Sequence, residues 1–381
     1  MKLIHIADTH LGLAAFSRLD PASGMNMREK QIYDNFLSAI DVIIKQKPDA
    51  LVHAGDLFDV VKPKTKAYTT VLAALGHLHE AGIPVIVIAG NHSMTKTRYT
   101  VSPYEVLDYH PSRLIAAFRF RYESVEIGDT MFHLLPNMLR PEDYRTEFEK
   151  IEINKSHANV LVTHGLATQI KDKRLATVAE HELDGTILSD TFDYIALGHY
   201  HRQSQVTDNA WYAGSTEFLT YGEIHDTKGG LVVDTAKPRE VQHLDLPKTL
   251  MADCGTIKCA GVHPGDVTDE IVQRVEKLGL PKYSMAQVTL DGMSREHGKG
   301  LDPYVLAPVR ELLLDLKIRI RTEEEDKPVP LQQDIRMVDY LQEFAAFVEK
   351  KQLTGKQREF VLAKGKDVLQ GVIDEHRGGG E

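Results

Sequence analysis

Apolar and polar segments alternate along the first hundred residues in a pattern that predicts strands and helices in turn. Continuous apolar runs at residues 2–8, 49–56 and 83–92 are typical of strands that are buried on both faces. Between them, apolar residues recur at helical spacing over 28–47 and 65–82. Strand, helix, strand, helix, strand in this order predicts a mainly parallel sheet with helices on both faces.

More strand-like segments follow in the middle of the chain. Two apolar runs, at 158–165 and 192–201, resemble the earlier buried strands. Four shorter segments suggest a second, mixed sheet: 122–128, 130–136, 229–235 and 239–246.

The pattern changes near residue 245. A helix is expected over 265–279, with Thr268 as its cap, followed by strands at 283–292 and 317–321. The segment 302–316 is predicted to be helical at least after Pro308. Two helices end the chain, at 337–353 and 355–376. We therefore expect three parts, 1–245, a small α+β domain at 246–327, and a linker with two helices at 328–381.

Composition narrows the classes of partner. The chain has 381 residues and a net charge of −10, so nucleic acid would bind through local basic patches and not through a global positive field. Cys254 and Cys259 cannot complete a zinc site alone and are expected to pack on opposite faces of a strand. Sparse cysteine and the lack of a run of roughly 20 apolar residues indicate a cytoplasmic protein.

Side chains of metal-ligand type follow five of the predicted strands, where each strand ends. The carboxyl ends of parallel strands meet at one edge of a sheet, so these side chains are expected to lie close together. Asp-x-His and His-x-His also place alternate residues on the same side of an extended chain. The candidate ligands are Asp8, His10, Asp56, Asn91, His164, His199 and His201.

This set of imidazoles, carboxylates and an amide suits Mn²⁺, Mg²⁺, Fe²⁺ or Zn²⁺. Seven groups are too many for one tetrahedral ion, but they fit two ions that share a bridging carboxylate. Two ions roughly 3.5–4 Å apart are a standard arrangement for phosphoester hydrolysis. A single strand-end residue is more often structural, yet five such segments in order favour a shared site. His5 and His53 lie inside strands and are expected to be core histidines.

The chain carries, in order, the motifs D-x-H (8–10), G-D-x-x-D (55–59), G-N-H (90–92), T-H-G (163–165) and G-H-x-H (198–201). This set resembles the calcineurin-like metallophosphoesterase superfamily. Within it, "DTHLG", "GDLFD" and "GHYH" are similar to the SbcD-type DNA repair exonucleases. The resemblance implies an α/β fold, a four-layer α/β/β/α sandwich with a small α+β cap and a C-terminal helical pair. It also implies Mn²⁺-dependent DNA cleavage, as a 3′-to-5′ exonuclease on duplex ends and an endonuclease on single strands.

The resemblance also implies a role for each ligand-type residue. His92 would stand beside the scissile phosphate, where a protonated imidazole stabilises the charge that builds on the leaving oxygen. Asp56 would bridge the two ions. The implied ligands are Asp8, His10 and His201 for one Mn²⁺, and Asn91, His164 and His199 for the other.

Ser93 departs from the family pattern, in which an acidic residue usually follows the catalytic His. Such an acid orients the His and raises its pKa through its charge, whereas serine brings no charge. Either another acid, for instance Asp59, supplies the pairing, or His92 is a weaker acid in this protein. Asp59 also fits the start of a helix.

DNA and two protein partners are expected. Cations around the strand ends would bind phosphates, although each one alone is more often a solvated charge. The C-terminal helices carry more apolar surface than they can bury on each other, so they are expected to dock on the main body or on a partner. The resemblance implies docking on an SMC-like ATPase of SbcC type. It also implies a homodimer through helices near 68–75 and 104–107. The candidate DNA contacts are Arg18, Arg28, Lys62, Lys64, Lys96, Arg98, Tyr99 and Arg202.

Two other functions stay open at this point. Another metallophosphoesterase, either a phosphatase or a phosphodiesterase, would need the same metal ligands, although the cap, the helical tail and the basic loops argue against it. A catalytically weak scaffold that binds DNA ends is favoured only by Ser93. The filled ligand positions argue against a scaffold, because a scaffold needs no metal.

Overall fold

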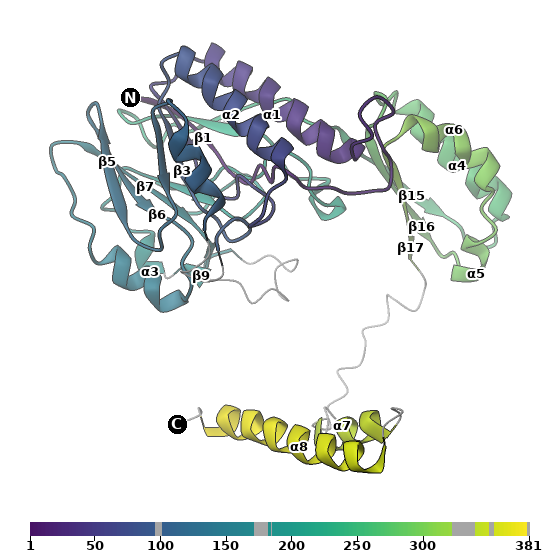
Figure 1. The fold of residues 1–381 in the computed structure, drawn as a ribbon. Helices are drawn as coiled ribbons and strands as arrows, with labels where there is room; N and C mark the ends of the chain where they lie inside the picture. The colour runs from purple at the N-terminus through teal and green to yellow at the C-terminus, as the bar shows by residue number, and fades with distance from the viewer. Residues whose placement is uncertain (96–100, 171–181, 184, 322–339, 350–353, 379–381) are drawn as a thin grey trace. The chain divides into compact units, whose positions relative to one another are not determined.

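A computed structural model describes the chain except for residues 96–100, 171–181, 184, 322–339, 350–353 and 379–381 (Figure 1). The chain divides into two compact units, Met1–Thr322 and Glu323–Glu381. The first unit contains every strand described below. Across the described residues, no helix has the length and apolar character needed to cross a membrane.

The first sheet has six strands in the order β14-β13-β1-β2-β3-β4. Strands β1 to β4 are parallel, as the sequence predicts, and β13 pairs with β1 in the antiparallel direction. The bounds are β1 Lys2–Ile6, β2 Ala50–His53, β3 Val85–Ile88, β4 Leu114–Ala117, β13 Gly230–Asp234 and β14 Gln242–Leu244.

Two long helices cover one face of this sheet. Helix α1, Met27–Lys45, starts at Asn26, whose side chain accepts a hydrogen bond from Glu29 N, and this is a typical N-cap. Helix α2, Thr65–Glu80, is followed by Gly82 in the left-handed region with φ 72°. The apolar sides of both helices share one core with the strands of the sheet. Both helices therefore hold β1 to β3 in place from outside.

The second sheet also has six strands, in the order β11-β12-β10-β7-β6-β5. Its outer face packs against α3, Pro141–Phe148, and the 3-10 helix η3, Gly185–Ile187. The bounds are β5 Glu123–Ile127, β6 Thr130–Leu135, β7 Ala158–His164, β10 Tyr194–Gly198, β11 Ser204–Gln205 and β12 Ala210–Tyr212. The short strands β8 Leu166–Ala167 and β9 Glu182–Leu183 form a separate pair.

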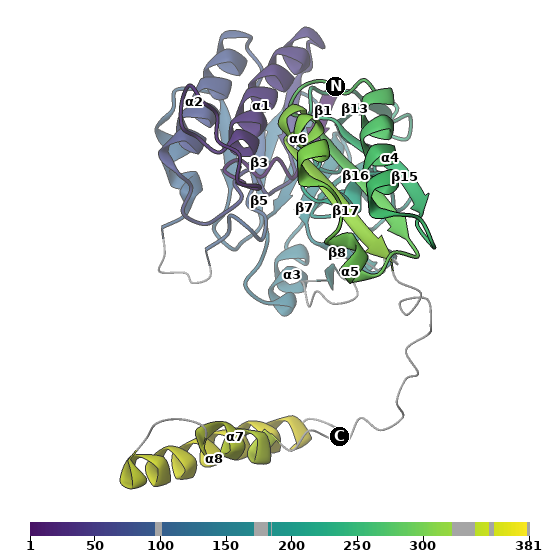
Figure 2. The ribbon, with the colours of Figure 1, turned by 90° about the vertical axis from the view of Figure 1, so that its right-hand side faces the viewer.

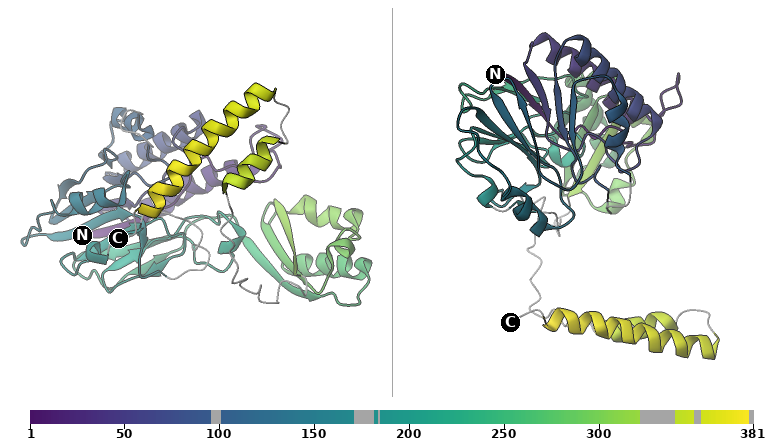
Figure 3. Two further views of the ribbon diagram at one scale, coloured as in Figure 1. Left: turned by 90° about the horizontal axis from the view of Figure 1, so that it is seen from below. Right: turned by 60° about the vertical axis from the view of Figure 1, so that its left-hand side comes forward.

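The two large sheets pack face to face. Val52 and Ile86 from the first sheet share a buried core with Phe132, Val160 and Ala196 from the second. With α1 and α2 outside one sheet and α3 outside the other, the predicted four-layer α/β/β/α sandwich is confirmed (Figures 1 and 3).

One prediction about the sheets was wrong. The segments 229–235 and 239–246 form β13 and β14, which extend the first sheet and not the second. Val232 lies opposite Ile4 of β1, so β13 completes an edge that would otherwise be unpaired. The apolar pattern predicted the strands, but it does not encode which edge they join.

Beyond residue 250 a three-stranded parallel sheet, β15-β16-β17, carries helices on one face (Figure 2). The strands are β15 Met251–Lys258, β16 Met285–Asp291 and β17 Asp315–Arg321, and the helices are α4 Pro264–Lys277, α5 Arg295–Gly298 and α6 Pro303–Leu312.

Three details of this segment differ from expectation. Thr268 is not a cap, because α4 begins four residues earlier and Thr268 donates to Pro264 O inside it, while His263 caps the helix. Helix α6, Pro303–Leu312, confirms the helix after Pro308 but ends four residues before the predicted segment does. Cys254 and Cys259 are buried packing residues, but both face the same core because the strand register shifts between Asp253 and Thr256.

The second unit consists of α7, Tyr340–Glu349, and α8, Gly355–Gly378, which lie side by side (Figure 3). Phe344 of α7 packs where Gly365 leaves room on α8. Phe347 is 57% exposed and Phe360 is 65% exposed. The pair of helices is therefore confirmed, and the two helices do not bury all of their apolar surface against each other.

The 3-10 helix η1, Pro103–Tyr109, contains residues 104–107, one of the two segments predicted to form the dimer contact. Tyr104 and Leu107 are buried in the core beside α2, so these two side chains cannot contact a second copy. Val106 is 42% exposed and Tyr109 is 91% exposed.

Candidate functional site

The ends of β1, β2 and β10 turn sharply at the residues predicted to bind metal. Asp8 has φ 51°, His10 has φ 46°, Asp56 has φ 52° and His199 has φ 102°. Residues with a side chain rarely adopt this left-handed region, and such strain concentrates at functional sites. Gly55, with φ 100°, makes the same kind of turn without a steric cost.

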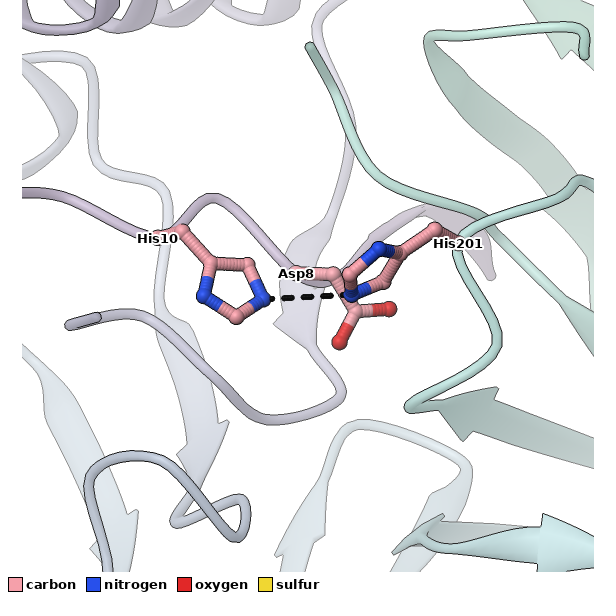
Figure 4. Close-up of side chains that lie close together, drawn as sticks. All are labelled: Asp8, His10 and His201. Atoms are coloured by element: carbon pink, nitrogen blue, oxygen red, sulfur yellow. Dashed lines mark hydrogen bonds between the residues drawn. The ribbon is translucent and has the colours of Figure 1, made fainter. Parts of the chain in front are cut away.

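Asp8, His10 and His201 form the first group of ligand-type side chains. His10 Nε2 lies 3.2 Å from His201 Nε2, and Figure 4 shows the two rings turned toward each other beside Asp8. His10 Nδ1 donates to Asp59 Oδ1 at 3.0 Å, and His201 Nδ1 donates to Glu223 Oε1 at 3.1 Å. With the proton on Nδ1 in each ring, two Nε2 lone pairs converge on one point, which is what a metal ion requires.

Asn91, His164 and His199 form the second group. His164 Nε2 lies 2.9 Å and His199 Nδ1 lies 3.0 Å from Asn91 Oδ1. His164 Nδ1 donates to Ala54 O at 2.8 Å, so its Nε2 is left as the ligand atom. His199 N donates to both carboxylate oxygens of Asp8 at 3.0 Å, which ties the second group to the first.

Asp56 lies between the two groups. Its Oδ2 is 3.2 Å from His164 Nε2 and 3.9 Å from His10 Nε2, and the side chain is buried. Burial works to raise the pKa of Asp56, but the charge and hydrogen bond of His164, with His10 and His92, lower this pKa below its usual value. The carboxylate is therefore charged, which suits the bridging role that the resemblance implies for it.

The seven predicted ligands thus meet at one edge of the sandwich, and their donor set fits divalent metal ions. Metal binding by these residues stays a prediction. Asp8, His10 and His201 lie within 4.8 Å of one another by one ligand atom each, as do Asp8, Asp56 and His164. The oxygen and imidazole donors without sulfur suit Mn²⁺, Mg²⁺, Fe²⁺ or Zn²⁺.

His92 stands at the outer side of this edge, with 45% of its side chain exposed. Its backbone N–H donates to Asp56 Oδ1 at 2.9 Å, and its Nδ1 donates to the carbonyl of Asp59 at 3.1 Å. The rings of His92 and His10 are 4.6 Å apart. His10, Asp59 and His92 also form a third group with ligand atoms within 4.8 Å. The ring is anchored at Nδ1 and open to solvent, as an acid that meets a substrate must be.

Ser93 faces away from this site. Its side chain is fully buried, and its Oγ lies 2.9 Å from the hydroxyl of Tyr104. Asp59 supplies the carbonyl that holds His92, and its Oδ1 lies 3.9 Å from His92 Nδ1. The ring of His92 is therefore held by the neutral backbone carbonyl of Asp59, while the Asp59 carboxylate is hydrogen-bonded to His10.

His5 and His53 are buried histidines of the core, as expected. His5 Nδ1 bonds with the hydroxyl of Tyr194 at 2.9 Å, and His53 Nε2 bonds with Thr9 Oγ1 at 3.0 Å. Burial lowers the pKa of each from 6.5 to about 3. Both rings are therefore neutral at physiological pH.

One predicted DNA contact was wrong. Arg28 is 1% exposed, and its guanidinium bonds with Glu217 Oε2 at 2.9 Å and with Phe218 O at 2.8 Å. The helical pattern placed Arg28 at the start of α1 but did not show that this turn is covered by the chain around residue 217.

The other cations differ in what they contact. Arg18 donates to the carbonyls of Arg310 and Glu311 at the end of α6, so it joins the first loop to this helix. Lys64 pairs with Glu29 at 2.7 Å, and Arg202 lies 3.8 Å from Asp226. Lys62 is exposed, and the remaining candidates, Lys96, Arg98 and Tyr99, lie outside the described residues.

The sequence analysis missed two residues at the site. Glu223 accepts the Nδ1 proton of His201, and Lys228 donates to Glu223 Oε2 at 2.7 Å. They lie in a polar stretch after the last motif, where no strand end or ligand spacing draws attention. Strand β13, which pairs with β1, begins two residues after Lys228 and brings this stretch to the site.

The chain is similar in sequence to a known family and to several named proteins. Residues 1–203, more than half of the 381, match the family described as Calcineurin-like phosphoesterase. The DNA double-strand break repair protein Mre11 of Methanocaldococcus jannaschii is 31% identical over 233 residues, which are 60% of this chain and 60% of that protein. The protein of the same name from Sulfurisphaera tokodaii is 29% identical over 242 residues, 61% of this chain and 59% of that one. The chain thus spans about three fifths of the length of these relatives.

Proposed function

Because the chain belongs to the calcineurin-like phosphoesterase family, we propose that it is a metal-dependent DNA nuclease of double-strand-break repair. The observation that carries the proposal is the convergence of His10 Nε2 and His201 Nε2, 3.2 Å apart, beside the charged, buried Asp56. The relatives named DNA double-strand break repair protein Mre11 support DNA as the substrate. We further propose Mn²⁺ as the metal, with exonuclease action on duplex ends and endonuclease action on single strands.

The seven strand-end residues would hold two ions around Asp56. Bound ions would supply a metal-activated water and neutralise charge on the phosphate. Asp56 holds the backbone of His92 at 2.9 Å, so the residue that would bridge the ions also fixes the outer histidine. His92, with Nδ1 bound to Asp59 O, would present its other ring nitrogen to the leaving oxygen and give it a proton.

Three further proposals concern the rest of the chain. Residues 1–245 would be the nuclease domain, and 246–327 a cap that helps to hold DNA. The segment 328–381 would bind an SMC-like ATPase through the exposed apolar side chains of α7 and α8, such as Phe347 and Phe360. The dimer contact would involve exposed residues of η1 such as Val106, since Tyr104 is buried.

Cleavage of end-labelled duplex DNA tests the proposal, with Mn²⁺ added to the metal-free protein. Wild type should release nucleotides from 3′ ends, and Asp56→Ala should not. A chromogenic phosphodiester measured side by side separates a nuclease from another metallophosphoesterase. Efficient hydrolysis of the small ester with intact DNA would refute the nuclease proposal in favour of that alternative.

His92→Ala tests the assignment of the catalytic histidine. Loss of a general acid should slow DNA cleavage by roughly 10²–10⁴-fold. Mn²⁺ binding should persist, because His92 contacts Asp56 through its backbone N–H and not through its ring. Undiminished cleavage by this variant would contradict the role.

A further inference from the structure

A fully enclosed lysine lies behind the first group of ligands. The side chain of Lys228 is 0% exposed, and its ammonium donates to Glu223 Oε2 at 2.7 Å and to Ser215 Oγ at 2.8 Å. Its third hydrogen bond, at 2.8 Å, goes to the backbone carbonyl of His201. Burying an ammonium costs several kcal/mol unless it is paired and hydrogen-bonded. Here all three N–H donors of the Lys228 ammonium have an acceptor, and one of these acceptors is a carboxylate.

Glu223 is equally well bonded. Its Oε1 accepts from His201 Nδ1 at 3.1 Å and from Thr220 Oγ1 at 3.3 Å. Its Oε2 accepts from Leu219 N at 3.0 Å as well as from Lys228. The carboxylate cannot rotate without breaking several of these bonds, so its orientation toward His201 is fixed.

We propose that Glu223 and Lys228 are positioning residues that fix His201 from both ends for metal binding. Lys228 holds the backbone of His201, and Glu223, itself held by Lys228, holds the ring at Nδ1. The hydrogen bond to Glu223 determines which ring nitrogen carries the proton, and it leaves Nε2 as the ligand atom. A carboxylate that bonds the far nitrogen of a metal-binding histidine typically governs metal affinity.

The inference rests on the proposed function, because it takes His201 as a metal ligand. It predicts that Glu223 and Lys228 matter for one ion more than for the other, since His201 belongs to the first group only. In the second group, His164 is oriented by a different contact, the hydrogen bond from its Nδ1 to Ala54 O.

A second buried ion pair in the same unit provides a matched control. Arg28 and Glu217 are 2.9 Å apart and as deeply buried. The carboxylate of Glu217 also bonds Asn35 and Thr249, so its partners lie outside the ligand set. Glu217→Gln therefore perturbs a buried carboxylate without disturbing His201.

The experiment titrates the metal-free full chain with Mn²⁺ by calorimetry and by electron paramagnetic resonance. Wild type, Glu223→Gln, Lys228→Met and Glu217→Gln are compared, with circular dichroism melts to confirm that each is folded. Wild type should bind two ions and give the signal of a coupled pair. Glu223→Gln should bind one of them roughly 10–100-fold more weakly and lose the coupled signal at low Mn²⁺.

The remaining variants decide between positioning and general destabilisation. Lys228→Met should weaken the same ion, and Glu217→Gln should bind both ions as wild type does. Wild-type affinity for both ions in Glu223→Gln and Lys228→Met would overturn the inference. An equal loss in Glu217→Gln would overturn it too. A wild-type chain that binds no Mn²⁺ would instead refute the proposed function, and the inference with it.

Discussion

Asp59→Asn separates two contacts that one residue makes. The Asp59 carboxylate accepts from His10 Nδ1 at 3.0 Å, whereas its backbone carbonyl accepts from His92 Nδ1 at 3.1 Å. Asparagine has nearly the same size and can still accept a hydrogen bond, but it carries no charge. The substitution therefore weakens the hydrogen bond that orients His10, a predicted metal ligand, while the backbone hydrogen bond to His92 stays intact.

The expected magnitude follows from the hydrogen bond to His10. A hydrogen bond to a charged group contributes about 1.5–3 kcal/mol and a neutral one about 0.5–1.5 kcal/mol. The Asp59 side chain is only 18% exposed, so solvent screens the difference little. A loss of about 1.4 kcal/mol corresponds to a tenfold weaker metal affinity.

DNA cleavage measured over a range of Mn²⁺ concentrations tests this reasoning. The half-saturating Mn²⁺ concentration should rise about tenfold, and the rate at saturating Mn²⁺ should stay close to wild type. Asp34→Asn on the exposed face of α1 is the control, since Asp34 pairs with nearby Lys30. If Asp59→Asn instead slows cleavage at saturating Mn²⁺ with unchanged metal dependence, the carboxylate acts on His92 from 3.9 Å and the reasoning is wrong.

Three more predictions concern buried residues. Ser93→Ala should lower the free energy of unfolding by about 1 kcal/mol, the net contribution of one hydrogen bond, and leave the pH profile of cleavage unchanged; a shifted profile would show that Ser93 acts on His92. Arg28→Ala should lower this free energy by about 3–5 kcal/mol, because it leaves Glu217 buried and unpaired. The salt dependence of DNA binding should not change, and a shallower slope would restore Arg28 as a phosphate contact. The pKa of His5 is about 3 in the fold and 6.5 as a free group, so the unfolded chain binds more protons between these values. Stability from its neutral ring is therefore complete above pH 6.5 and declines as the pH falls toward 3. Urea unfolding measures this. Between about pH 6.5 and about pH 5, the free energy of unfolding should fall by about 1.5 kcal/mol more in wild type than in His5→Gln. An equal fall in both proteins would contradict a neutral, buried His5.

Much of the fold was predictable because it depends on local patterns. Continuous apolar runs identified β1, β2 and β3, and helical spacing identified α1 and α2. Their parallel order follows from the alternation itself, because a helix between two strands returns the chain to the same end of the sheet. The placement of β13 beside β1 was not predictable, since a pairing across more than two hundred residues leaves no mark in either segment.

For the candidate site, too, one part was predictable from the sequence and another part was not. Its seven ligand-type residues follow strand ends, and topology brings the ends of parallel strands together. The roles of Asp59, Glu223 and Lys228 depend on contacts between loops, whose course the sequence pattern does not specify. The same holds for Arg28, a cation whose burial became apparent only from its pairing with Glu217.

The sequence by itself thus predicted the parallel strands with their helices, and the positions of the ligand-type residues and His92 after strand ends, because periodicity and strand order are local properties with few topological solutions. Only the tertiary structure decided what each side chain touches. Ser93 follows His92 directly, yet it faces Tyr104, while Asp59, far away in sequence, holds the histidine. Neighbouring residues at a turn point in different directions, and hydrogen bonds form between groups that packing brings within 3 Å or so.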